Sequence, residues 1–93
     1  MPSSKFDILK RRVGAYCNVN AFDLNALKVN LEDPNNERFG KIFQQELDEV
    51  IETVALSRSA YEQLTDHEFE DDADYVAHLK SIRGFLFEGA PHP

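Results

Sequence analysis

The strongest constraint on the fold is a run of apolar residues between positions 39 and 54 that recur at helical spacing. Successive members are one, three or four positions apart, so they fall on one face of an α-helix of about four turns; they are Phe39, Ile42, Phe43, Leu47, Val50, Ile51 and Val54. A helix with one apolar face has to bury it against other elements. We therefore expect a domain organised around this helix.

Two helices are predicted before it. The first covers residues 5–16, where Ser4 and Asp7 resemble a capping box and the apolar positions are again three or four residues apart: Phe6, Leu9, Val13 and Tyr16. The second is shorter and ends before the turn-forming residues 33–36. Val29 and Leu31 would also suit a strand, but the spacing of Leu24, Leu27 and Leu31 favours a helix.

Two further helices are predicted after it. Either Ser57 or Ser59 can cap a short fourth helix, whose apolar side includes Tyr61 and Leu64. A fifth helix follows an acidic stretch and can be capped by Asp72 or Asp74; its apolar side is formed by Tyr75, Leu79, Ile82 and Leu86.

The chain is therefore predicted to be all-α, a compact bundle of about four to five helices. Its 93 residues suit one domain, 1–93, and their 42% apolar content is sufficient for one modest core. We expect the core to use residues 5–87, and residues 88–93 to form a loose tail.

Acidic residues are concentrated in one part of the chain. Residues 44–74 contain eleven Asp or Glu and one cation, Arg58, whereas the chain as a whole has a net charge of -7. Six of these acids occupy positions 66–74: Asp66, Glu68, Glu70, Asp71, Asp72 and Asp74. Their mutual repulsion raises the free energy of the folded state unless a cation compensates it, which indicates a basic partner.

The helix over 39–54 adds acids that lie off its apolar stripe and are expected on its solvent side: Glu46, Asp48, Glu49 and Glu52. If this helix neighbours segment 66–74, the two form one broad negative face. Such a face speeds association with a cationic partner. The alternative is a solvated surface that keeps the protein soluble.

We favour the binding surface. The predicted partner-binding residues are Glu49, Glu52, Tyr61, Asp66, Glu68, Glu70, Asp71, Asp72, Asp74 and Tyr75. The two tyrosines border the acidic segment, where they would be either interface anchors or core residues.

No residue pattern indicates catalysis, and we expect no enzyme activity, metal or cofactor. Asp66, His67 and Glu68 are adjacent, so on a helix they point in different directions, and His67 is expected to be a solvated surface residue. The acids of 70–74 lack the glycine and the distant glutamate of a calcium loop. His67 and His78 have no cysteine nearby to form a zinc signature.

The remaining composition indicates a cytoplasmic protein. The single cysteine, Cys17, cannot form an internal disulfide and is expected to be a small buried hydrophobe. No stretch has the apolar length of a signal peptide or a membrane span. Nucleic acid is not expected as a direct ligand, because phosphate binding requires a Lys- and Arg-rich surface.

The chain resembles the small bacterial immunity proteins of contact-dependent growth inhibition. Three parts carry the resemblance: the helix that closes with Gly14, Ala15 and Tyr16, the central acidic helix over 39–51 with Glu46, Leu47 and Asp48, and the closing helix of Tyr75, Leu79, Ile82 and Leu86 after an acidic loop. Together they span most of residues 5–87.

The resemblance implies an antidote that binds the toxin domain of a delivered surface protein and blocks its active site or substrate surface. Many such toxins are nucleases with basic clefts, which agrees with the separate argument from charge. We expect a monomer when free and a heterodimer with the toxin. The alternative is a small acidic helical adaptor or regulatory subunit that binds a basic host protein.

Overall fold

The structure is a computed structural model that describes residues 6–93, and within this range it contains helices and no strand. Five are α-helices and one is a short 3-10 helix: α1 (Asp7–Tyr16), α2 (Leu24–Glu32), η1 (Pro34–Asn36), α3 (Glu37–Thr53), α4 (Arg58–Thr65) and α5 (Asp72–Phe87). The prediction of a small all-α domain is confirmed.

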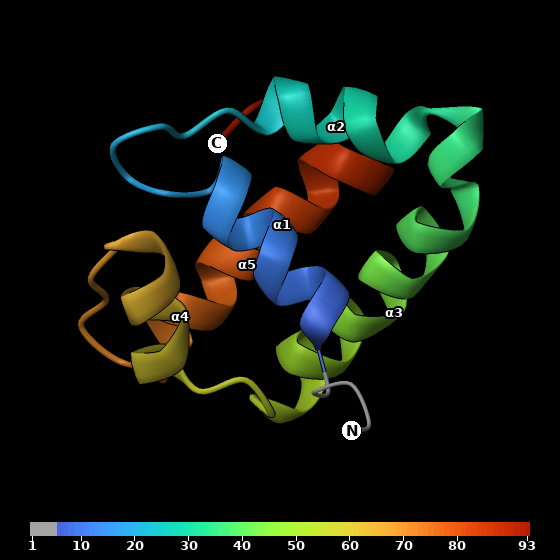
Figure 1. The fold of residues 1–93 in the computed structure, drawn as a ribbon. Helices are drawn as coiled ribbons and strands as arrows, with labels where there is room; N and C mark the ends of the chain where they lie inside the picture. Colours follow the sequence, from blue (N-terminus) through green and yellow to red (C-terminus); the bar gives the residue numbers. More distant parts are fainter. Residues whose placement is uncertain (1–5) are drawn as a thin grey trace.

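The helices pack around α1, α3 and α5 (Figure 1). Helix α1 contacts α2, α3 and α4, whereas α5 contacts α2 and α3. The segment between α4 and α5 lies at the left of Figure 1, and the corner where α2 passes into α3 lies at the right. These two regions are therefore on opposite sides of a molecule whose longest extents are 38 and 37 Å.

The predicted stripe of α3 is confirmed over most of its length, since Phe43, Leu47 and Val50 are fully buried. Phe39 is the exception, with 43% of its surface exposed. At this end of α3 the neighbouring helix α2 approaches the Gly40 side instead, where a Cβ on Gly40 would lie 3.0 Å from the carbonyl oxygen of Leu31. The ring of Phe39 lies beneath the guanidinium of Arg12, 5.6 Å from the ring centroid.

Helix α2 is confirmed, and its valine faces solvent. Leu24, Leu27 and Leu31 are buried, whereas Val29 is 69% exposed. The alternative of a strand through Val29 and Leu31 is therefore wrong, because the leucine spacing rather than β-propensity determined the element.

The helix starts differ in detail from the predictions. Ser57 caps α4, its Oγ accepting a hydrogen bond from the Ala60 N–H at 3.1 Å. Helix α5 is capped by Asp71, so the expectation of Asp72 or Asp74 was wrong. The Asp71 carboxylate accepts from the Asp74 N–H at 2.8 Å, and Asp72 and Asp74 occupy the first turn, where the helix dipole favours them.

The start of α1 is described from Phe6 onward. Phe6 precedes the helix in a left-handed conformation, with φ of 65°, and provides no side-chain cap. The proposed capping serine, Ser4, and residue 5 lie outside the described residues.

The tail over 88–93 is exposed throughout but folds back on the domain. The N–H of Ala90 donates to the Gly84 carbonyl oxygen at 3.0 Å. The ring of His92 lies 5.8 Å from that of Phe22 and 5.1 Å from that of Phe85, measured between centroids. Within residues 6–93, no helix has the length and apolarity to cross a membrane.

Candidate functional site

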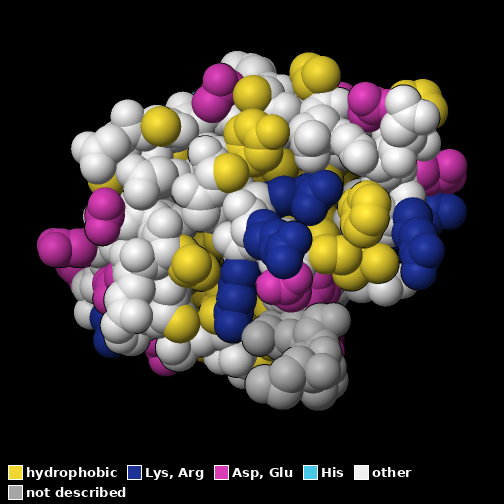
Figure 2. Space-filling model, viewed as in Figure 1, with side chains coloured by type: hydrophobic (Ala, Val, Ile, Leu, Met, Phe, Trp, Pro, Cys, Tyr) yellow, Lys and Arg dark blue, Asp and Glu magenta, His cyan; other side chains and the backbone are white. Residues whose placement is uncertain are grey.

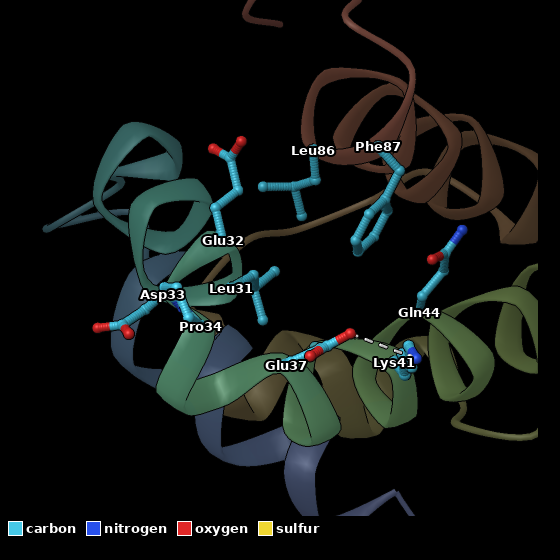
Figure 3. A pocket seen from close by; sticks show the side chains of 10 residues that line it. Leu31, Glu32, Asp33, Pro34, Glu37, Lys41, Gln44, Leu86 and Phe87 are labelled. Carbon is cyan, nitrogen blue, oxygen red and sulfur yellow. Dashed lines mark ion pairs between the residues drawn. The ribbon is translucent and has the colours of Figure 1, made fainter.

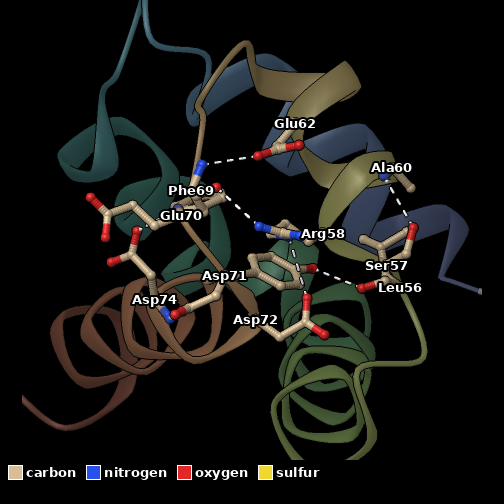
Figure 4. A network of polar contacts seen from close by, with 11 residues as sticks. Leu56, Ser57, Arg58, Ala60, Glu62, Phe69, Glu70, Asp71, Asp72 and Asp74 are labelled. Carbon is tan, nitrogen blue, oxygen red and sulfur yellow. Dashed lines mark hydrogen bonds and ion pairs between the residues drawn. The ribbon is translucent and has the colours of Figure 1, made fainter.

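Residues 66–71 connect α4 to α5 and direct a group of carboxylates outward (Figure 4). All six acids of segment 66–74 are exposed: Asp66, Glu68, Glu70, Asp71, Asp72 and Asp74. We call segment 66–74, which carries these acids, the acidic loop. Asp66 ends α4 with φ of 60°, a left-handed conformation that Asp tolerates better than most residues, and the chain turns sharply there.

Arg58 holds the acidic loop in place from the first turn of α4. Its Nη1 donates to the Phe69 carbonyl oxygen at 3.1 Å, and its Nε pairs with the Asp72 carboxylate at 3.4 Å. Both contacts are visible in Figure 4. The one cation of residues 44–74 therefore ties the loop backbone to the start of α5, and it compensates part of the loop's charge.

A second set of hydrogen bonds fixes the loop backbone. Glu62 accepts from the Phe69 N–H at 2.9 Å, and the buried Thr65 hydroxyl accepts from the His67 N–H at 3.3 Å. Asp74 accepts from the Glu70 N–H at 3.3 Å. Because these bonds satisfy the backbone, the loop has a defined conformation rather than that of a free linker.

Rings anchor the middle of the loop to the core. Phe69 lies between Tyr61, Tyr75 and His78, with centroid distances of 5.9, 5.4 and 5.0 Å. His67 packs against the ring of His78, also at 5.0 Å, and its Nε2 is buried. His67 was expected to be solvated and is half-buried, because Phe22 and Phe69 cover its ring.

His78 is held in its neutral form by its surroundings beneath the acidic loop. His78 contacts the Tyr61 hydroxyl through Nε2 at 3.0 Å. Burial, with His67 beside it, lowers the pKa of His78 to about 4, although the carboxylate of Asp74 acts in the opposite direction. His78 is therefore neutral at physiological pH.

Tyr61 and Tyr75 are core residues rather than interface anchors. Both are at most 1% exposed. The Tyr75 hydroxyl donates to the Leu56 carbonyl oxygen at 2.9 Å, and burial raises the pKa of both phenols. Of the two alternatives left open by the sequence, the structure selects the core for both, because their rings fill the space beneath the acidic loop.

The acids of α3 do not form a single solvent-facing arc. Glu46 and Asp48 are two positions apart, so they project from opposite flanks of the helix. Glu46 accepts from the Leu9 N–H of α1 at 3.3 Å, and burial raises its pKa. Asp48 pairs with Arg83 of α5, which also contacts Glu88 at 2.9 Å. Both residues lie off the apolar stripe as predicted, but each contacts a neighbouring helix, and the Asp48 side chain keeps 45% of its surface exposed.

The other two acids of α3 were predicted as partner-binding residues. Glu52 is exposed near the end of the helix, whereas Glu49 is half-buried. Helix α3 packs against α5, and Asp48 and Phe43 contact the second half of α5 at Arg83 and Phe87. Within residues 6–93, exposed carboxylates without an ion pair occur in the acidic loop, among them Asp66, Glu68 and Glu70. Others lie outside the loop, at Asp23, Glu32, Asp33 and Glu52.

The opposite sign of charge gathers on another face. Figure 2 shows Lys and Arg side chains clustered over α1, which carries Lys10, Arg11 and Arg12. Arg11 pairs with Asp7 at 3.3 Å along the helix, and Arg12 covers Phe39. Charge is therefore separated across the molecule, although the chain is acidic overall.

The residues considered for chemistry are either exposed acids, such as Asp66 and Glu68, or groups closed off from solvent, such as the Nε2 of His67 and the thiol of Cys17. Asp66, His67 and Glu68 line a shallow polar hollow of about 300 Å³, but the buried Nε2 of His67 is not open to it. Cys17 is fully buried, which raises the pKa of its thiol to about 12. Within residues 6–93, no three side chains of the His, Cys, Asp and Glu types are grouped to hold a metal ion.

Sequence reasoning missed the residues that shape the loop: Arg58, Glu62, Thr65 and Phe69. A signal for Arg58 existed, because it is the one cation in an acidic stretch. The contact of Glu62 with Phe69 depends on a chain reversal that periodicity does not reveal.

Fold and site together define a small all-α domain with a braced acidic loop. Comparison with family models, with curated proteins and with solved structures found no match. The argument for function therefore depends on the residues of this chain.

Proposed function

We propose that this protein is a non-enzymatic binding protein whose acidic loop docks on a cationic surface of a partner protein. The observation that carries the proposal is the arrangement of the loop: its backbone is braced by Arg58 and Glu62, while Asp66, Glu68 and Glu70 project outward. A preformed loop loses little conformational entropy on binding, so more of the interaction energy appears as affinity.

The partner we propose is the toxin domain of a contact-dependent growth inhibition system, with this chain as the cytoplasmic immunity protein. The resemblance in the three helical segments supports this proposal. A nuclease toxin presents a basic cleft for its substrate, and an acidic loop placed there would exclude nucleic acid. The mechanism is occlusion, and it requires no chemistry from this chain.

The partner has to be identified first. We propose an affinity pull-down of the tagged protein against the products of neighbouring genes, at low and at high salt. An immunity gene should directly follow a gene for a large secreted protein. Recovery of that protein's C-terminal domain in a salt-sensitive manner would support the antidote, whereas recovery of a basic host protein alone would support the adaptor.

The role of the loop is then tested by association kinetics. The variant Asp66→Asn, Glu68→Gln, Glu70→Gln removes three charges and spares the cap at Asp71 and the pair at Asp72. We expect its association rate with the partner to fall about tenfold at low salt and to approach the wild-type rate at high salt, because steering by exposed charge is screened.

A control removes exposed charge outside the acidic loop, through Asp23→Asn, which keeps a capping side chain for α2, and Glu88→Gln. It should slow association much less than the loop variant does. Equal rates for the wild type and the loop variant at every salt concentration would exclude the acidic loop from the mechanism.

A further inference from the structure

A groove lies on the side of the molecule away from the acidic loop, where α2 passes into α3 beside the end of α5. Its volume is about 450 Å³. In Figure 3 the side chains of Leu31, Leu86 and Phe87 point into the space between these three helices. The groove is therefore lined by apolar side chains in its interior, and its volume is in the range of sites that take small ligands or large side chains.

Helix packing fixes the walls of the groove. The close approach of α2 to α3 at Gly40 sets one end, since a Cβ there would lie 3.0 Å from the Leu31 carbonyl oxygen. Phe87 is held by the ring of Phe43, with centroids 6.2 Å apart. Asp33 accepts from the Asn35 N–H at 2.9 Å and so fixes the turn into η1. The groove is thus a feature of the packed fold.

The rim of the groove is acidic. Glu32 and Glu37 are exposed carboxylates at the rim, which also holds one cation, Lys41. The carboxylate of Asp33 is directed away from the groove in Figure 3 and caps η1. Lys41 pairs with Glu37 at 3.5 Å, but both side chains are more than 70% exposed, at 73% and 72%. An exposed pair of this kind contributes little, so an incoming cation can replace Lys41 as the partner of Glu37.

We propose that this groove binds a basic peptide segment that inserts one bulky apolar side chain between α2, α3 and α5. The apolar interior would bury that side chain, and flanking Lys or Arg residues would meet Glu32 and Glu37 at the rim. The acidic rim repels phosphate, which argues against a nucleic acid. The site is separate from the acidic loop and does not depend on the proposed function.

The test uses the full chain and a capped peptide with one phenylalanine flanked by lysines, followed by ¹⁵N–¹H NMR. We expect shifts at the backbone amides of residues 31–41 and 84–88. Replacing the peptide phenylalanine with glycine should weaken binding about tenfold, because a buried aromatic anchor contributes more than rim charges do. Glu32→Lys should weaken binding about threefold or more through charge reversal at the rim.

Glu52→Lys, at an exposed position outside both the groove and the acidic loop, is the matched control with the same change of charge, and it should leave binding at the groove unchanged. Shifts confined to residues 66–74 would overturn the proposal without touching the proposed function, since the peptide would then be held by charge alone. Shifts of the groove amides with protein concentration, in the absence of peptide, would also overturn it by assigning the groove to a second copy of the chain.

Discussion

At the scale of single residues, identity alone did not determine role in the acidic segment. Asp71 caps a helix, Asp72 pairs with Arg58, and Glu68 stands free in solvent, although all three are acids within one short stretch. The three side chains differ in role because the fold places different hydrogen-bond donors and cations next to each of them. For the same reason His67 and His78 are packed among rings rather than solvated.

His78 should make stability depend on pH. Its pKa is lowered from 6.5 to about 4, so it stays neutral in the folded chain while it protonates in the unfolded one. Above about pH 6.5 His78 is neutral in both states and its titration does not affect stability. As the pH falls from 6.5 toward 4, the unfolded chain binds the proton more tightly than the folded one, so the free energy of unfolding decreases by up to about 3 kcal/mol. We expect urea unfolding of the wild type, relative to His78→Gln, to show a loss in this window.

Glutamine at position 78 can still bond to the Tyr61 hydroxyl and does not titrate, so the difference between the two chains isolates the histidine. The carboxylates that also titrate near pH 4 are common to both chains. Parallel pH profiles for the wild type and His78→Gln would show that His78 is not held neutral by the fold.

At the scale of elements, the five α-helices were predicted, as were the ends of α1 at Tyr16 and of α2 at Glu32, whereas the capping residues of α4 and α5 were not settled. Periodicity is a property of many residues, whereas a cap depends on which one of several suitable side chains bonds the first free N–H groups. Ser57 and Ser59 were both predicted as possible caps of α4, and Asp72 and Asp74 as possible caps of α5. The geometry of the preceding turn selected Ser57 and Asp71.

Removal of the Asp71 cap of α5 should lower the free energy of unfolding more than removal of the neighbouring Asp72 carboxylate does. We expect Asp71→Ala to lower the free energy of unfolding by about 1 kcal/mol, because it exposes an unsatisfied N–H at Asp74. Asp72→Ala loses an exposed ion pair and a favourable dipole contact, about 0.5 kcal/mol. Urea denaturation of both variants measures the difference; an equal or reversed order would assign the cap to another residue.

At the scale of the whole molecule, packing distributes charge that the sequence had concentrated. Helix α3 has α1 and α5 as neighbours, and Glu46 and Asp48 make contacts with them. The basic residues of α1 gather on another face. What remains exposed is an acidic loop at one side and an acid-rimmed apolar groove at the other.

Two glycines test how closely the helices approach one another. A Cβ at Gly40 would lie 3.0 Å from the Leu31 carbonyl oxygen, which is backbone and cannot rotate away. We expect Gly40→Ala to destabilise the protein by about 1–2 kcal/mol, because α2 and α3 would have to separate. Thermal and urea unfolding both measure this loss.

Gly14 is the matched control, since it also lies inside a helix. Its Cβ would be 3.9 Å from the Leu64 carbonyl oxygen, an ordinary contact. Gly14→Ala should therefore stabilise the chain by about 0.5–1 kcal/mol through helix propensity. Similar effects at both positions would mean that the approach at Gly40 is not limiting.

The sequence by itself determined the all-α class, the approximate extent of each helix and the concentration of acid in 66–74. These properties follow from local spacing and composition, which each segment carries with it. The burial of Tyr61 and Tyr75, the bracing of the loop by Arg58 and the groove beside Phe87 were decided by the tertiary structure alone. Each depends on residues from different helices meeting in space, and spacing along one chain segment carries no information about that.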